Sequence, residues 1–277
     1  DSSKMVIVKN TINSSMWVTE DNRSESVHQL ASNNGDGFYG ISWTPDGKIL
    51  YTSRSPDKWD LWEKDPRSGK STRLTVNVGN NYYPSASSDG RYIVFTSDRG
   101  GPFNVWKMDR DGSNPIRLTH GSFEDFPYFT PDNKWVIYRS TDRNNRGLWK
   151  VAAEGGESVP LTDKYTYAPA LSSDGRWIAS FYSLGALRGL AIFPIEGGTP
   201  TKTFDVLPRA AGDAFSQVIH WTRDMKAISY GDHQKGASNI WQQPLARGSP
   251  QQLTEFTSDN IYFFVWSIVG KRLALCR

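Results

Sequence analysis

Short apolar runs separated by polar turns recur along the whole chain. Residues 49–52, 92–96 and 135–138 are rich in β-branched, aliphatic and aromatic side chains, which favours strands. Apolar residues are not spaced by three or four positions over any useful length, so the pattern does not predict helices. An Asp-Gly or Asp-Asn pair precedes each run, and these residues tolerate the positive φ of a tight hairpin turn. The pattern therefore predicts antiparallel β-hairpins.

The hairpins belong to a longer repeat with a period of 42 to 50 residues. After each Asp turn and its β run comes a second run with an apolar-Trp pair, and most units end on Leu-Thr. Each unit thus predicts four strands, a to d: strand a precedes the turn, b follows it, c carries the tryptophan, and d ends at Leu-Thr. Such repeats are typical of propeller blades. The turn aspartates are Asp46, Asp89, Asp132, Asp174 and Asp224, with a degenerate copy at Val269.

The repeat predicts an all-β fold, a six-bladed β-propeller of four-stranded antiparallel blades that forms a single domain over residues 1–277. Residues 1–35 supply strands b to d of one further blade, and residues 259–277 supply strands a and b. The simplest closure pairs the C-terminal strand a with the N-terminal strands in one composite blade, which removes exposed sheet edges. One strand is then surplus, either residues 5–9 or residues 273–277. The five full blades cover 36–78, 79–121, 122–164, 165–211 and 212–258.

Composition narrows the class of protein. Aromatic residues make up 13% of the chain, which a disordered segment would not carry. The net charge is +3 and the basic residues are spread evenly, so we expect no nucleic-acid partner. No apolar stretch approaches the length of a membrane span, so we expect no membrane insertion. We also expect the protein to be a monomer. The single cysteine excludes an internal disulfide. The chain begins at Asp1, so we expect a mature or excised piece without its targeting signal.

Chain direction assigns the loops to two faces. The a–b and c–d turns share one face, which we expect to be inert because its Asp-Gly turns are short and uniform. The b–c and d–a connections share the other, where irregular loops favour function. Counting back seven residues from each turn aspartate predicts a ring of side chains at the channel mouth, where tyrosine would suit binding. The alternative is that these rings merely fill the funnel. The ring comprises Tyr39, Tyr82, Asp125, Tyr167, Gln217 and Tyr262.

Three further residues are candidates on the channel. Arg99 and Arg143, in b–c loops, are expected to flank the mouth. His220 lies four residues before its turn aspartate, where it would face the channel. A histidine in that position is either a ligand-binding group or an interior residue satisfied by its neighbours.

Several motifs resemble a known family. The stretches 44–48, 96–101, 105–109 and 111–119 read Thr-Pro-Asp-Gly-Lys, Thr-Ser-Asp-Arg-Gly-Gly, Val-Trp-Lys-Met-Asp and Asp-Gly-Ser-Asn-Pro-Ile-Arg-Leu-Thr. They resemble the PD40, or WD40-like, repeat of TolB-type propellers, which also occurs in gating propellers of prolyl-oligopeptidase-type peptidases. The resemblance covers nearly the whole chain and implies the propeller fold. TolB-type relatives imply a bacterial, periplasmic or extracellular domain that binds a partner, and peptidase-type relatives imply gating of a catalytic domain outside this sequence.

Catalytic motifs do not decide the function. The sequence contains no Gly-x-Ser-x-Gly, His-Glu-x-x-His or Gly-x-x-x-x-Gly-Lys motif. Propellers can still converge single oxygen ligands around a divalent ion such as Ca²⁺, and Glu124, Asp125 and Asp259 are the candidates. The favoured hypothesis is a non-catalytic recognition propeller that needs no cofactor and binds a protein or peptide segment, or alternatively a glycan, at the mouth. The competing hypothesis is a divalent-ion-assisted hydrolase or lyase with its site in the channel.

Overall fold

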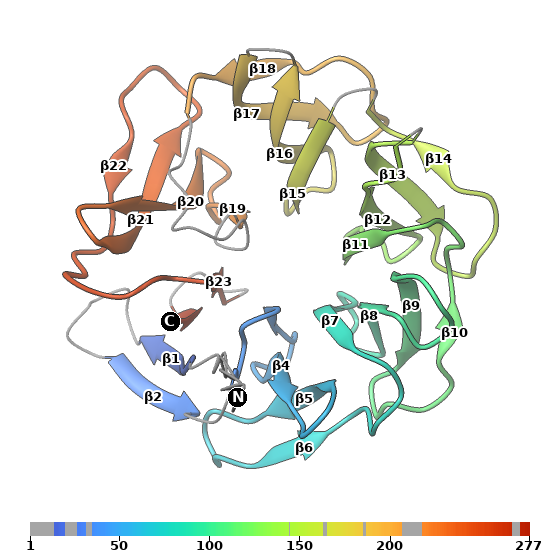
Figure 1. Ribbon diagram of the computed structural model, residues 1–277. Coiled ribbons are helices and arrows are strands. Elements are labelled where there is room, and N and C mark those ends of the chain that lie inside the picture. The colour runs from blue at the N-terminus through green and yellow to red at the C-terminus, as the bar shows by residue number, and fades with distance from the viewer. Residues whose placement is uncertain are drawn as a thin grey trace, which may run out of the picture.

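The computed structural model describes residues 14–19, 27–31, 35–143, 145–162, 165–184, 187–206, 218–267 and 272–277. These residues form six four-stranded antiparallel sheets arranged radially around a central axis, which confirms the predicted six-bladed propeller (Figure 1). They contain no helix, and hence none long and apolar enough to cross a membrane.

Each full blade uses four consecutive strands, with the first nearest the axis and the last at the rim (Figure 1). Blade 1 comprises β3 (Ile41–Trp43), β4 (Ile49–Arg54), β5 (Trp59–Lys64) and β6 (Ser71–Arg73). Blade 2 comprises β7 (Asn81–Ala86), β8 (Tyr92–Ser97), β9 (Asn104–Asp109) and β10 (Ile116–Arg117). Blade 3 comprises β11 (Glu124–Phe129), β12 (Trp135–Ser140), β13 (Gly147–Ala152) and β14 (Val159–Pro160). Blade 4 comprises β15 (Tyr165–Leu171), β16 (Trp177–Leu184), β17 (Leu187–Pro194) and β18 (Lys202–Phe204). Blade 5 comprises β19 (Ile219–Trp221), β20 (Ala227–Gln234), β21 (Ala237–Pro244) and β22 (Gln251–Gln252).

The sixth blade is composite and joins the two ends of the chain. Its order is β2 (Val27–Ala31), β1 (Met16–Thr19), β24 (Leu273–Cys276) and β23 (Phe263–Trp266). The C-terminal segment therefore supplies strands a and b, and the N-terminal segment supplies c and d. The simplest closure, with three N-terminal strands and one C-terminal strand, is wrong. Residues 273–276 take the b position because they pair with β1 on one side and β23 on the other. Residues 5–9 lie outside the described residues.

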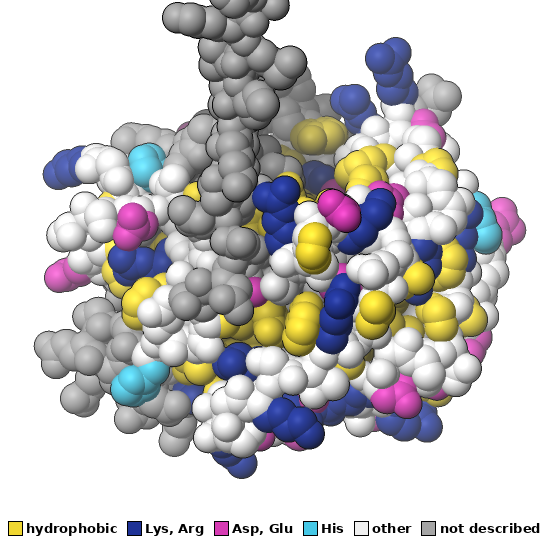
Figure 2. Space-filling model, turned by 60° about the horizontal axis from the view of Figure 1, so that its bottom comes forward, with side chains coloured by type: hydrophobic (Ala, Val, Ile, Leu, Met, Phe, Trp, Pro, Cys, Tyr) yellow, Lys and Arg dark blue, Asp and Glu magenta, His cyan; other side chains and the backbone are white. Residues whose placement is uncertain are grey.

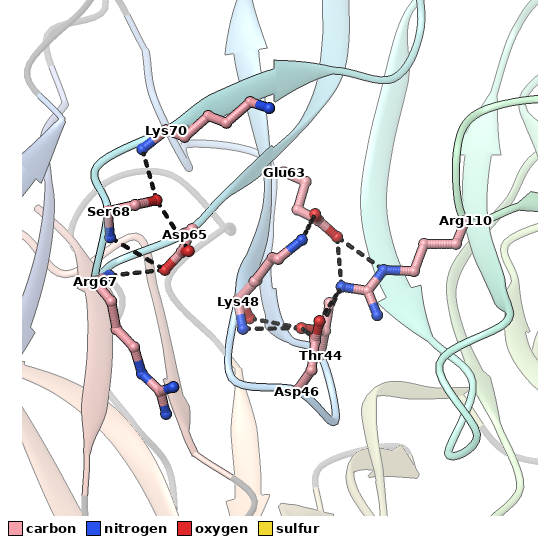
Figure 3. A network of polar contacts seen from close by, with 9 residues as sticks. All are labelled: Thr44, Asp46, Lys48, Glu63, Asp65, Arg67, Ser68, Lys70 and Arg110. Carbon is pink, nitrogen blue, oxygen red and sulfur yellow. Dashed lines mark hydrogen bonds and ion pairs between the residues drawn. The ribbon is translucent and has the colours of Figure 1, made fainter.

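The Asp turns owe their recurrence to one hydrogen bond. In each full blade a Ser or Thr two residues before the aspartate donates its hydroxyl to the carboxylate, at 2.5 to 2.7 Å. The pKa of Asp89 is lowered to about 2, and the hydrogen bond from the Ser87 hydroxyl is the main cause. In blade 1 the turn also reaches the neighbouring blade, because Arg110 of blade 2 binds both Asp46 and Glu63 (Figure 3). The turn aspartates are thus structural.

The Leu-Thr ending and the inner tryptophans are also explained by hydrogen bonds. The hydroxyl of Thr75 accepts the backbone N–H of Leu61 at 2.9 Å, which ties strand d to strand c, and three other units repeat this bond. The indole of Trp221 in blade 5 donates to the Ala170 carbonyl of blade 4 at 2.9 Å, and Trp43 in blade 1 donates to the composite blade. Apolar side chains fill the spaces between blades, as where Leu61 packs with blade 2.

Candidate functional site

The inner strands of blades 2 and 3 carry an irregularity that directs aromatic side chains inward. β7 and β11 each contain a β-bulge, and within these bulges Tyr83 and Phe126 have φ of 52° and 51°. Side chains with a Cβ disfavour this left-handed region, so both positions are strained. Bulges re-aim side chains, and strain of this kind concentrates at functional sites.

Three aromatic rings meet at this level of the channel. The ring centroids of Tyr83 and Phe126 are 4.1 Å apart, and Phe263 of the composite blade lies 5.8 Å from Tyr83 and 6.5 Å from Phe126. Blade 3 and the composite blade are three apart in a ring of six, so contact between their side chains spans the axis. All three residues are buried. We call these three residues the ring plug, because the contacts between their buried rings cross the axis of the channel.

Above the plug, on the face of the d–a connections, lies a continuous row of aromatic rings. Tyr39 contacts Tyr82 at 4.5 Å and Phe38 at 4.8 Å between ring centroids, and Phe38 contacts Tyr262 at 4.6 Å. Phe103 extends the row from Tyr82 at 5.3 Å to Phe123 at 5.4 Å. We call this row the aromatic arc; its members are Tyr262, Phe38, Tyr39, Tyr82, Phe103 and Phe123.

The structure thus brings together three of the predicted mouth residues, Tyr39, Tyr82 and Tyr262. The phenylalanines of the arc were missed by sequence reasoning because they stand outside the repeated position. Phe38 precedes a mouth tyrosine, whereas Phe103 and Phe123 lie in connections that differ in every blade.

Other predicted mouth residues lie apart from the arc. Tyr167 contacts Tyr165 and Phe181 within its own blade, at 5.8 and 5.4 Å between centroids. Arg143 is exposed, and Gln217 lies outside the described residues. Arg99 is half-buried: its guanidinium stacks over Trp106 and donates to Asn81 at 2.9 Å, which anchors the loop.

Asp125 occupies the mouth position in blade 3 but is buried. Its carboxylate accepts two hydrogen bonds from the guanidinium of Arg139, its cross-strand partner on β12. Burial raises the pKa of Asp125, and the charge of Arg139 opposes this rise. Arg139 also stacks over Phe126 with its guanidinium carbon 5.1 Å from the ring centroid. The ion pair therefore contacts the ring plug beneath the mouth surface and stabilises the position of Phe126.

The three candidate metal ligands have separate protein partners. Glu124 accepts from the Asn104 amide at 2.7 Å and from the Gly121 backbone, and Asp259 accepts from Arg277 at 2.8 Å. Asp125 pairs with Arg139 as described. Within the parts of the chain that the structure describes, no three His, Cys, Asp or Glu side chains cluster in a geometry suited to a metal ion.

The opposite face, which carries the Asp turns and was expected to be inert, contains a cavity of about 900 Å³. This face is therefore not flat, and whether it is inert stays a prediction. Blades 3, 4, 5 and the composite blade wall it with the residue three before the turn, which is Phe129, Leu171, Trp221 and Trp266. His220 also lines it, as its register predicts.

His220 is the titratable member of the predicted site that lines this cavity. Its Nε2 donates to the Phe264 carbonyl at 2.7 Å, and its ring packs edge-on against Phe264 at 5.0 Å. Burial lowers the pKa of His220 to about 4, so the imidazole is neutral at physiological pH. His220 is thus an interior histidine whose ring N–H is satisfied by a neighbour, and it also forms part of the cavity wall.

Surface charge is mixed around these features. The part of the surface seen in Figure 2 shows small groups of hydrophobic side chains with Lys and Arg between them and scattered acidic residues. On the Asp-turn face, Lys107 pairs with Glu154 and Lys150 pairs with Glu196, each across a blade junction.

The fold and its repeats define a β-propeller of the PD40 type. A model of the TolB β-propeller domain, PD40, matches residues 1–166, which is more than half of the chain. The chain therefore belongs to this family. No curated protein is similar enough in sequence to match it.

Solved structures show the same fold at low sequence identity. TolB from Acinetobacter baumannii is 19% identical with a TM-score of 0.69, and the match covers 96% of this chain and 64% of that one. The chain thus spans less than two thirds of that protein. A putative TolB from Agrobacterium tumefaciens is 16% identical with a TM-score of 0.74, covering 97% and 99%. Oligogalacturonate lyase from Vibrio parahaemolyticus is 13% identical with a TM-score of 0.62, covering 91% and 81%.

Proposed function

We propose that this propeller is a non-catalytic recognition domain that binds an extended protein or peptide segment on the aromatic arc. The observation that carries the proposal is the arc itself, six rings in contact that span four consecutive blades on the irregular face. Its members Tyr39, Tyr82, Phe103 and Tyr262 are partly exposed, and Phe123 is 39% exposed. Aromatic residues of this kind dominate the energetics of protein interfaces.

The alternative, that the mouth tyrosines fill the funnel, has less support. One residue further along three of the inner strands, the ring plug already occupies the channel, and its members are at most 8% exposed. Burial raises the pKa of Tyr82, so its hydroxyl stays protonated and can donate to a ligand at neutral pH. The rings thus combine apolar faces with polar tips, a combination suited to recognising both side chains and backbone of a peptide.

Family membership supports a partner-binding role and a bacterial, periplasmic or extracellular location as parts of the same proposal. We further propose a monomer that needs no ion, because the three candidate ligands are already held by protein donors. The proposed binding surface is the same whether the partner is another protein or another domain of the same protein.

A peptide selection tests this function. A phage-displayed library of random peptides is panned on the wild-type protein, and selected peptides are measured by fluorescence anisotropy. We expect the Tyr39→Ala, Tyr82→Ala double variant to weaken binding by at least about tenfold, since each buried aromatic contact contributes on the order of 1–3 kcal/mol. The matched control is Tyr92→Ala, a half-buried tyrosine of blade 2 next to its Asp turn. Equal binding of the selected peptides to the wild type and the double variant would refute the proposal.

A further inference from the structure

The cavity on the Asp-turn face, which we call the chamber, is separate from the aromatic arc. In blade 3 the inner strand passes from the mouth to the plug and then to the cavity, because Asp125 and Phe126 are followed by Tyr128 and Phe129. None of the arc residues lines the cavity. Leu253, Thr254 and Phe256, in the d–a connection after β22, also line the cavity, so it extends between blade 5 and the composite blade. A ligand in this chamber does not touch the arc residues and so does not compete with a ligand on the arc.

The aromatic walls of the chamber are held in fixed orientations. The indole N–H of Trp221 donates to the Ala170 carbonyl at 2.9 Å, and that of Trp266 donates to the Ser229 hydroxyl at 3.0 Å. Because both N–H groups are bonded to the protein, the contribution of these indoles to a ligand is their apolar ring surface. Tyr128 provides a third ring from the other side of the channel.

Backbone acceptors on the inner strands next to the chamber are already engaged. Side chains of neighbouring blades bond to the carbonyls of Ala170, Phe264 and Val265. A peptide that adds to a sheet edge depends on such main-chain groups. These three contacts disfavour strand addition here, so the chamber favours a ligand recognised through side chains.

The polar groups that line the chamber carry no net charge, because Arg223 and Asp224 contribute one charge of each sign. Neutral His220 and the Gln242 amide line it, and so does Thr19, whose buried hydroxyl, in a residue only 3% exposed, has no hydrogen-bond partner among the described residues. The carboxylate of Asp224 accepts the Thr222 hydroxyl and a backbone N–H within its own turn. A charged ligand would lose hydration and would meet a like charge as well as an opposite one.

We propose that this chamber binds a neutral saccharide. A pyranose ring has an apolar C–H face that stacks on fixed aromatic rings, and an edge of hydroxyls that bond to amide, hydroxyl and imidazole groups. The volume of about 900 Å³ lies within the usual range for small-molecule sites and accommodates a short oligosaccharide. A neutral, hydroxyl-rich ligand matches both the aromatic walls and a polar lining without net charge.

Calorimetric titration with the neutral trisaccharides cellotriose, maltotriose and N-acetylchitotriose tests the proposal, with trigalacturonate as the acidic comparator. We expect at least one neutral sugar to bind, and Trp221→Ala and Gln242→Ala each to weaken it by about tenfold or more. Trp221→Phe, which retains an apolar ring, should restore part of the affinity. Phe123→Ala, in the aromatic arc, should leave sugar binding unchanged. Gln242 is half-buried, so its variant keeps the test valid if Trp221→Ala does not fold.

Three results would overturn the proposal. One is the absence of heat from all three neutral sugars at about 10 mM, a concentration that would detect even millimolar affinity. Another is tighter binding of trigalacturonate than of any neutral sugar. The third is that Trp221→Ala and Gln242→Ala weaken binding of the selected peptides, which would make the chamber a peptide site. Loss of peptide binding in the Tyr39→Ala, Tyr82→Ala variant bears on the aromatic arc alone, so the two proposals fail separately.

Discussion

Removing the charge of Arg139 should destabilise the propeller through Asp125. The carboxylate of Asp125 is 2% exposed and the Arg139 side chain is 16% exposed, so screening by solvent is small. Deleting one partner of a buried ion pair leaves an uncompensated charge and costs about 3–5 kcal/mol. For a domain of this size each kcal/mol lowers Tm by roughly 2–4 °C, which predicts a fall of roughly 6–20 °C for Arg139→Met.

The pH dependence of this destabilisation tests whether an uncompensated charge on Asp125 causes it. Without Arg139, burial holds the folded-state pKa of Asp125 above its unfolded value. A group of this kind contributes stability below the unfolded pKa, and that stability is lost as pH rises through the folded pKa. The deficit of Arg139→Met relative to the wild type should therefore be small near pH 4 and reach its full size at pH 7 and above.

The assay is urea unfolding followed by tryptophan fluorescence at pH 4, 5.5 and 7.5. Arg139→Lys keeps the charge but loses the bidentate contact and the stacking on Phe126, so it should show a smaller deficit. The double variant Asp125→Asn, Arg139→Met removes both charges and should recover most of the lost stability at pH 7.5. A deficit that does not change with pH, or no deficit, would show that Asp125 is not held as a buried ion pair.

Two further predictions follow from the same geometry. Gly40→Ala should destabilise by at least about 2 kcal/mol in urea unfolding, because Gly40 has φ of 130° and a Cβ would lie 2.9 Å from the Tyr83 Cα. Gly69→Ala, at φ of 73° with no atom within 4 Å, is the control, and equal effects would contradict the predicted clash. The Tm should be the same in EDTA and in Ca²⁺, because the candidate ligands already have protein partners. A bound ion at about 100 times its Kd would stabilise the folded state by about 2.7 kcal/mol, so a rise in Tm of corresponding size would indicate an ion site.

The repeat was sufficient to predict the blades because the five full blades share the turn hydrogen bond, as at Asp89, and four of them share the strand-closing hydrogen bond, as at Thr75. The order of strands in the composite blade was not predictable. Residues 5–9 and 273–277 both have the apolar pattern of a b strand, and only pairing in three dimensions distinguishes them.

The mouth was predictable in part. Counting from the turns located Tyr39, Tyr82 and Tyr262, because the register along the inner strand is conserved between those blades. Asp125 occupies the same register but is buried in an ion pair with a cross-strand arginine 14 residues away. A repeat pattern does not show such a pair. The chamber around His220 arises from differences among equivalent residues, since Trp221 and Trp266 stand where blade 2 has Ala86. Averaging over repeats hides these differences.

Hydrogen exchange of the protein, alone and with a selected peptide bound, tests the central claim that recognition occurs on the aromatic arc. Peptide binding should slow exchange of backbone amides at residues 38–40, 81–83 and 261–263, and leave those at 219–222 unchanged. Protection confined to residues 219–222, or spread evenly over all blades, would contradict the account.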